Sequence, residues 1–588
     1  MWKTCKNLFA IALALCLLLP ALSVWADEED FPGWITPEIE PRFAEPGTQS
    51  APLLRAAPLP ESYGFSRGED GTLEVYGQTP VRNQGSNGAC WAFSTFAAAE
   101  AGLLRAGVGA PDLSETHMIY SAIRYDNSGS DTGNAEQGYP TRLSQGGNIL
   151  YAASYLMRGT KLGGTLAEAD DPYVSSALPF RSVTETSARG EHRKYTVRNI
   201  PIITGKKKDI YDPSNPDNIS AVEMAEIKRA VQSFGAVSTS IYWSTTGTNY
   251  NPKTGAYYAS RQYAANHAVA VVGWNDAYSS ENFLVTPPGD GAWLIKNSWG
   301  TGADKGEGGS GYYWVSYYDK RIGEWTYAID GVTDFDPAAS VYEYDYRLDD
   351  TLKGYDAYVV CFPANRVEQL TEVKIMLDSP AEFQISVCAD YIPGDARELS
   401  MEDFSLVQTV RKENPGFYTI PLENPVIIAG EFFAVRVSFL SDAEETEIYS
   451  YKKDSFPRLD TETGSYSAVF AHRPEDEEWG LVRTSNISVP CIKAVTVPFE
   501  GIYIRNAQTD AGLLSVAVDS GTPIQATVVA ASYLDGRMLK ISSSSIMFTP
   551  GQNLAELALS LYEGQDCKVF LLDAASGQPL CPVWEGPS

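Results

Sequence analysis

The stretch QGSNGACWAF at residues 84–93 places one cysteine, Cys90, where a glycine-rich loop enters an apolar, alanine-rich segment. The composition of residues 89–106 favours a helix, and Gly107 is a typical stop. The free N–H groups and the dipole at a helix start favour an anion, so we expect the pKa of the Cys90 thiol to fall. A thiolate is a nucleophile suited to acyl transfer. The side-chain amide of Gln84 could join the Cys90 N–H to bind a developing oxyanion.

Two later blocks supply the partners that such a thiolate needs. His267 opens the almost wholly apolar segment 267–274, which has the composition of a buried strand. Asn297 and Trp299 follow a second apolar segment, 293–296. An asparagine oxygen can hold an imidazole N–H and fix the ring, and a neighbouring tryptophan can keep water away from that hydrogen bond. Segments 291–295 and 311–317 are also predicted to be strands, so an α+β unit is expected here.

In their order along the chain, QGSNGACWAF, NHAVAVVGW and KNSWG resemble the papain family of cysteine peptidases, over residues 59–333. The resemblance implies a two-lobed fold, one lobe helical and one β, with the site in the cleft between them. It implies that no metal or organic cofactor is needed. It implies catalytic roles for Cys90 (nucleophile), His267 (acid–base), Asn297 (orienter of the imidazole) and Gln84 (oxyanion donor). On the substrate side it implies Gly146 and Gly147, which meet the substrate backbone by hydrogen bonds, and Trp299, which covers the Asn297–His267 contact.

Several features depart from that family's pattern. Asn87 stands where the family often has a second cysteine, three residues before the nucleophile. Cys90 and His267 lie further apart in sequence than the roughly 130–150 residues typical of the family signature. Residues 27–58 contain six prolines and are predicted to be a Pro-rich leader or linker. This leader is shorter than the family's usual helical inhibitory propeptide, so any mechanism of latency is left open.

The first 26 residues are typical of a secretory signal peptide. Lys3 and Lys6 precede an unbroken apolar run at residues 8–19, and the sequence up to Ala26 suits a cut before an acidic stretch. The run is too short to span a bilayer of about 30 Å as a helix. We therefore expect no membrane span, and an exported protein that is secreted, extracellular or at the cell surface.

The pattern of apolar and polar residues along the chain changes from about residue 340. Apolar residues alternate with polar ones around positions 373–377, 383–387 and 433–439, and again around 557–561. Such period-2 patterning predicts β-sandwiches. Residues 340–497 resemble the lectin-like domain that follows bacterial and archaeal papain-type domains, and residues 498–588 resemble a C-terminal β-sandwich module of secreted bacterial proteins. The predicted fold class is thus α+β: a papain-like two-lobed catalytic domain followed by two mostly-β, sandwich-like domains.

Aromatic residues and cysteines of this second half leave two questions open. Tyr342, Tyr344, Tyr346, Tyr449, Tyr451 and Trp479 could form a sugar-stacking surface, although tyrosine also simply suits strands. The five cysteines at positions 361, 388, 491, 567 and 581 leave at least one unpaired. Cys567 and Cys581 are the pair nearest in sequence, but the connectivity cannot be deduced.

The charge of the chain limits its partners. Acidic residues number 74 against 45 Lys and Arg, a net charge of −29, which disfavours nucleic acid as a ligand. We expect a secreted cysteine-type endopeptidase that acts on protein or peptide substrates through a Cys–His thiolate–imidazolium pair and a thioester acyl-enzyme. The alternatives are an adhesin or glycan-binding protein on a peptidase-like scaffold, with glycan or cell-wall polymer bound by residues 340–588, and a cell-wall amidase.

Overall fold

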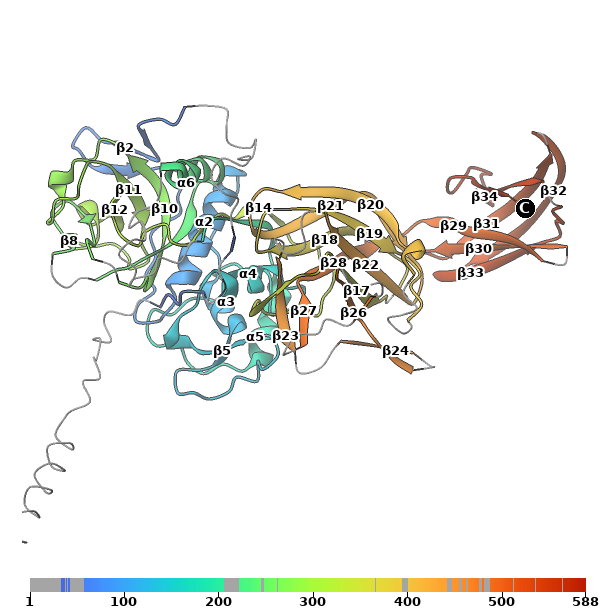
Figure 1. Cartoon of the computed structure of the whole chain (residues 1–588), viewed down its shortest axis with the longest axis horizontal. Coiled ribbons are helices and arrows are strands. Elements are labelled where there is room, and N and C mark those ends of the chain that lie inside the picture. The colour runs from blue at the N-terminus through green and yellow to red at the C-terminus, as the bar shows by residue number, and fades with distance from the viewer. Residues whose placement is uncertain are drawn as a thin grey trace, which may run out of the picture.

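The computed structural model places the helices of the first half beside a set of mostly antiparallel strands, and the second half consists almost entirely of strands (Figure 1). It describes residues 33–37, 39, 41–42, 58–205, 221–244, 248–261, 263–364, 366–393, 400–440, 447–453, 457–461, 464–474, 479–480, 487–510, 512–534, 536–562 and 564–587. The predicted signal peptide lies outside these residues. No helix among them is long and apolar enough to cross a bilayer.

The central helix of the first half begins at Cys90. The α-helices are α2 (Cys90–Arg105), α3 (Glu115–Ala122), α4 (Ile149–Met157), α5 (Val183–Arg189) and α6 (Ala221–Phe234). The helix predicted over 89–106 is therefore confirmed, and Gly107, with a φ of +87°, ends it. Twelve consecutive residues at the start of α2 are buried, because the helix packs against strands on one side and against α3 and α4 on the other (Figure 1).

The second lobe is built on the antiparallel order β7 (Val237–Ile241), β10 (His267–Asn275), β11 (Ala292–Lys296) and β12 (Tyr312–Ser316). The three strands predicted around 267–274, 291–295 and 311–317 are confirmed. Their inward side chains form an aromatic and β-branched core that includes Trp274, Trp293 and Val269. The other strands of this half are β1 (Ser62–Tyr63), β2 (Phe65–Arg67), β3 (Leu73–Val75), β4 (Ile123–Tyr125), β5 (Tyr139–Arg142), β6 (Tyr195–Thr204), β8 (Tyr250–Asn251), β9 (Ala256–Tyr257), β13 (Thr326–Tyr327) and β14 (Asp330–Asp334).

The strands that follow form a β-rich part with one apolar core between sheets. They are β15 (Ser340–Tyr342), β16 (Asp350–Lys353), β17 (Ala357–Pro363), β18 (Glu368–Leu377), β19 (Ala381–Cys388), β20 (Ser405–Lys412), β21 (Gly416–Ile428), β22 (Phe432–Phe439), β23 (Glu447–Lys453), β24 (Arg458–Thr461), β25 (Gly464–Ser467), β26 (Val469–His472), β27 (Ile487–Pro490) and β28 (Ile492–Pro498). The alternating residues of β18, β19 and β22 are buried, as the period-2 pattern predicts. β21 pairs with β6, so this part is hydrogen-bonded to the first half.

A last group of strands lies at the far end of the molecule (Figure 1). They are β29 (Ile502–Asp510), β30 (Leu513–Ser520), β31 (Ile524–Leu534), β32 (Arg537–Phe548), β33 (Gly551–Leu557), β34 (Asp566–Asp573) and β35 (Trp584–Pro587). They form a three-stranded and a four-stranded sheet around a separate apolar core. The chain is thus a two-lobed α+β unit followed by mostly-β sheets, as the sequence predicts.

Three of the five tyrosines that could form a sugar-stacking surface are buried. Tyr342, Tyr449 and Tyr451 are at least nine-tenths buried, and Tyr451 donates a hydrogen bond to the carbonyl of Glu136 in the first half. Tyr344 and Tyr346 are half-buried. Tyr342, Tyr449 and Tyr451 therefore cannot form an exposed platform for sugars, because their side chains are buried. The six cysteines after the signal stretch are free thiols in the structure, so the Cys567–Cys581 pair is not bonded there.

Candidate active site

Cys90 lies at the first position of α2 and is completely buried. Burial raises the pKa of its thiol to about 12, while N–H groups of Ala268, Trp91 and Cys90 itself act in the opposite direction. The prediction of a lowered thiol pKa is therefore wrong for this state of the protein, since loss of solvent outweighs the helix start. The contact with Ala268 places the sulfur beside the first residues of β10.

His267, the first residue of β10, is held by Asn297. Its Nε2 lies 2.8 Å from Oδ1 of Asn297, and its ring stacks on Trp299 at 4.7 Å between centroids and 15° between planes. The other ring nitrogen, Nδ1, is buried and has no hydrogen-bond partner among the residues that the structure describes. Burial lowers the pKa of His267 to about 4, and the bond to Asn297 raises it only in part. The imidazole is thus neutral at neutral pH, with Nδ1 available to exchange a proton.

A second tryptophan, Trp243, extends this aromatic cover. It meets Trp299 edge-on at 5.1 Å and His267 at 6.3 Å. Its backbone is locked to the residue before the histidine, because Asn266 accepts from the Trp243 N–H at 2.8 Å and donates to its carbonyl at 3.0 Å. Trp243 was not among the residues predicted from the sequence, because it follows β7 without any motif around it.

Gln84 and Asn297 are positioned by one short backbone ladder between two loops. The N–H of Gln84 donates to the carbonyl of Ser298 at 2.7 Å, and the N–H of Gly300 donates to the carbonyl of Arg82 at 2.8 Å. The side chain of Gln84 accepts from the Ser298 hydroxyl at 2.5 Å and donates to the carbonyl of Asn87 at 2.9 Å. The same contact therefore fixes the predicted oxyanion donor and the residue that orients His267.

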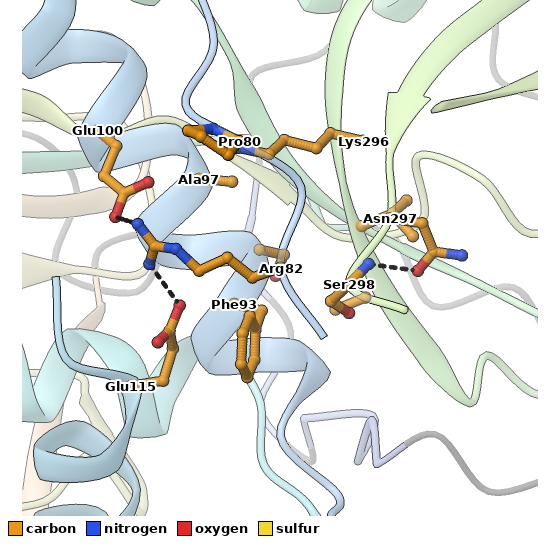
Figure 2. A pocket seen from close by; sticks show the side chains of 12 residues that line it. Pro80, Arg82, Phe93, Ala97, Glu100, Glu115, Lys296, Asn297 and Ser298 are labelled. Atoms are coloured by element: carbon orange, nitrogen blue, oxygen red, sulfur yellow. Dashed lines mark hydrogen bonds and ion pairs between the residues drawn. The ribbon is translucent and has the colours of Figure 1, made fainter. Parts of the chain in front are cut away.

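Behind this ladder lies a buried cluster of charged residues that the sequence analysis missed (Figure 2). Arg82 donates to Glu100 at 2.8 Å and to Glu115 at 3.1 Å. Thr79 joins the cluster to β11, since its hydroxyl donates to Glu100 at 2.5 Å and accepts from Lys296 at 2.8 Å. Burial raises the pKa of Glu115 to about 8 and lowers that of Lys296 to about 8. The cluster ties α2, α3 and β11 together beside a small cavity that reaches Asn297.

The paired glycines predicted on the substrate side contact the leader. Gly147 donates to the carbonyl of Gly33 and accepts from the N–H of Ile35, each at 3.0 Å, so Trp34 and Gly147 form a parallel β-bridge. The approach is close, because a Cβ on Gly146 would lie 1.8 Å from the carbonyl oxygen of Gly33. Trp34 is 6% exposed and belongs to the same buried apolar cluster as Cys90. The leader thus occupies backbone positions between the two lobes that the sequence analysis reserved for substrate.

Comparisons with known proteins agree with this geometry. Residues 74–327 match the model of the papain family cysteine proteases. The chain is 30% identical over 236 residues to cysteine proteinase 2 of Entamoeba histolytica, covering 39% of this chain and 58% of that protein. It is 29% identical over 223 residues to mouse cathepsin J, covering 38% of this chain and 53% of that protein. It therefore spans little more than half the length of these relatives.

Among solved structures, the chain is similar to the cysteine protease and lectin-like domains of Cwp84, a surface-layer-associated protein of Clostridium difficile. The TM-score is 0.57 at 20% identity, over 80% of this chain and 94% of that one. Cwp84 solved after propeptide cleavage gives 0.55 at 21% identity, over 71% and 97%. The likeness extends beyond the two lobes and shows a shared fold for the β-rich part as well. Over residues 74–327, the chain therefore matches the papain family of cysteine proteases.

Proposed function

We propose that the protein is a secreted cysteine-type endopeptidase in which Cys90 and His267 cleave peptide bonds. One observation carries this proposal: the His267 imidazole is fixed through Nε2 by Asn297 under Trp299, which leaves Nδ1 for the thiol at the start of α2. That is the arrangement needed for a nucleophile activated by an adjacent base that a third group orients.

The proposed reaction runs through a thioester. Cys90 Sγ attacks the scissile carbonyl carbon while its proton resides on His267 Nδ1. The Cys90 N–H and the Gln84 amide bind the oxyanion, and His267 then protonates the leaving amine as the C–N bond breaks. A water molecule, deprotonated by His267, attacks the thioester, and the acid product leaves with the thiol restored.

The leader would hold this site latent. With the leader in place, burial keeps the thiol and the imidazole neutral, and Gly147 and Asn266 are already paired with leader backbone. When the leader leaves, water reaches Cys90, the cost of desolvating the thiolate falls, and the helix start then favours the thiolate–imidazolium pair. The residues at 1–26 supply the export signal in this proposal.

The experiment that tests the proposed function is hydrolysis of an unfolded protein by the leader-free chain and its Cys90→Ala variant. We expect turnover to disappear while the thermal transition stays nearly unchanged, since the thiol is replaced by a smaller apolar group. Retention of even about a tenth of the activity would refute Cys90 as the nucleophile.

A second candidate function concerns the β-rich part, where a partly exposed tryptophan favours glycan binding. Trp479 lies 5.4 Å from the ring of His472, which in turn bonds Asp356 at 2.7 Å, and Arg473 lies over Tyr355. Aromatic faces beside polar groups suit sugars, which present apolar C–H faces and hydroxyls. A glycan array that gives hits with the full chain but not with Trp479→Ala would support this role, and an array without hits would exclude it.

A further inference from the structure

The leader has a second attachment, on the β-rich part rather than on the two lobes. The N–H of Arg42 donates to the carbonyl of Asp378 at 2.6 Å, and its guanidinium Nε lies 3.3 Å from Asp378 Oδ2. Asp378 directly follows β18. Its side chain is 1% exposed, against 39% for that of Arg42. A leader cation therefore reaches from the surface onto a buried carboxylate of the neighbouring module.

This contact differs from an ordinary surface ion pair because its carboxylate is buried. The Nε–Oδ2 distance of 3.3 Å is longer than that of the strongest charge-assisted hydrogen bonds, but such a bond gains strength when one partner is shielded from water. Withdrawing Arg42 would leave the buried Asp378 carboxylate with less compensation, which is costly. The backbone hydrogen bond adds a second, geometrically fixed connection at the same residue.

The two attachments are joined by a short connection. Trp34 in the cleft and Arg42 on Asp378 are eight residues apart, a span of at most roughly 27 Å for an extended chain. Pro37 and Pro41 are both buried, and each ring fixes the φ of its own residue. A short connection gives each attachment a high effective concentration for the other, so either one promotes rebinding of its neighbour.

We propose that the β-rich part is one half of a latch that keeps the leader in the cleft, with Asp378 as its receptor for Arg42. Opening of the cleft is then coupled to release of Arg42, although the described contacts of Arg42 are with Asp378 and not with the residues assigned to catalysis. This inference rests on the proposed function, because it takes the cleft that Trp34 fills to be the active site. It gives the β-rich part a role in regulating the peptidase that is separate from any glycan binding.

The test is the rate at which an epoxysuccinyl thiol probe labels Cys90 in the full chain, mapped by peptide mass spectrometry. We expect Arg42→Gln to raise the rate roughly fivefold to tenfold, as for loss of one charge-assisted contact. Asp378→Asn should act in the same direction. Arg366→Gln is the matched control: Arg366 is 49% exposed and pairs at 3.0 Å with Glu368, a 1%-exposed carboxylate on β18 that does not touch the described leader.

The outcomes separate the latch from the proposed function. Faster labelling in Arg42→Gln but not in Arg366→Gln supports the latch. Equal labelling in Arg42→Gln and the parent chain, while Gly33→Ala labels faster, overturns it, because only the cleft attachment then matters. Because Arg42 lies in the leader, its replacement leaves the packing of both halves intact even if Asp378→Asn misfolds. Hydrolysis by a leader-free chain is measured separately. Rapid hydrolysis there supports the peptidase proposal whether or not the latch exists.

Discussion

The backbone N–H of Trp34 donates a hydrogen bond of 3.0 Å to the carbonyl oxygen of Asn266, the residue directly before His267. The leader is therefore fastened beside the imidazole of the candidate site, while its neighbours Gly33 and Ile35 pair with Gly147 on the opposite wall. A peptide that bridges both walls in this way excludes a second peptide from the same backbone groups.

Replacement of Gly33 should open the cleft. Gly33 has a φ of +103°, and a Cβ there would lie 2.3 Å from Cα of Gly88, so Gly33→Ala cannot keep its place. We expect faster alkylation of Cys90 in the full chain, measured by mass spectrometry against time. Gly71→Ala is the matched control, since Gly71 has a φ of +83° but no atom near its would-be Cβ. Equal rates in both variants would mean that the leader does not limit access.

Loss of Asn297 should act on turnover rather than on binding. Asn297→Ala removes the acceptor 2.8 Å from His267 Nε2, and the ring loses the contact that sets its orientation. We expect kcat of the leader-free chain to fall roughly 10²-fold with little change in KM, because proton transfer is impaired and substrate contacts are not. Steady-state kinetics on a peptide substrate test this. A raised KM with unchanged kcat would place Asn297 in substrate binding instead.

The carboxylates that pair with Arg82 in the charged cluster of Figure 2 should contribute to stability according to how deeply each is buried. Glu100→Ala leaves the half-buried Arg82 and the buried Lys296 with less compensation, and we expect the free energy of unfolding to fall by about 3 kcal/mol. Asp112→Ala removes a partner of the same Arg82 that is 53% exposed, and should cost within about 1 kcal/mol. Urea unfolding of the two variants measures the difference. Similar losses for both would show that burial does not control this cluster.

A buried histidine away from the site should make stability depend on pH. His117 bonds Tyr155 at 2.9 Å, and burial lowers its pKa to about 3. The unfolded chain has a histidine pKa of about 6.5, so below that pH the unfolded state binds more protons and stability falls. His117→Gln removes this contribution to the unfolding free energy. Between about pH 7 and pH 4.5, the variant should therefore lose about 2 kcal/mol less of its unfolding free energy than the parent. Urea unfolding at both pH values measures these losses. Equal losses of unfolding free energy in the variant and the parent would show that His117 does not cause the pH dependence.

The candidate site could be anticipated because its chemistry requires particular side chains at the ends of local elements. Cys90 begins a helix and His267 begins a strand, and both positions are visible in local composition. The leader contact could not be anticipated, since Trp34 meets Gly147 and Asn266 through backbone atoms that any residue supplies. The direction of the Cys90 pKa shift was predicted wrongly, because the helix start is evident in the sequence and the burial caused by remote segments is not.

In the β-rich part, too, local sequence predicts some features, while others depend on remote segments. Alternation in β18 and β22 marks which side chains share a face, and those strands and their buried residues follow the prediction. The alternation of apolar and polar residues does not predict which part of the chain covers the second face of these strands. Tyr451 is therefore buried against Glu136 of the first half, rather than exposed to sugars. The latch contact between Arg42 and Asp378 likewise joins residues that no local pattern connects.

The most direct measurement for the central claim is selective labelling of Cys90 by an epoxysuccinyl probe in a leader-free chain that begins at Leu59, across a series of pH values. We expect rapid labelling at mildly acid pH, where a thiolate–imidazolium pair exists but a free thiol with a pKa of about 8.5 does not react. The His267→Ala variant should lose this acid labelling. Labelling that rises only above the pKa of an ordinary thiol, and is unchanged in His267→Ala, would contradict a Cys90–His267 catalytic pair.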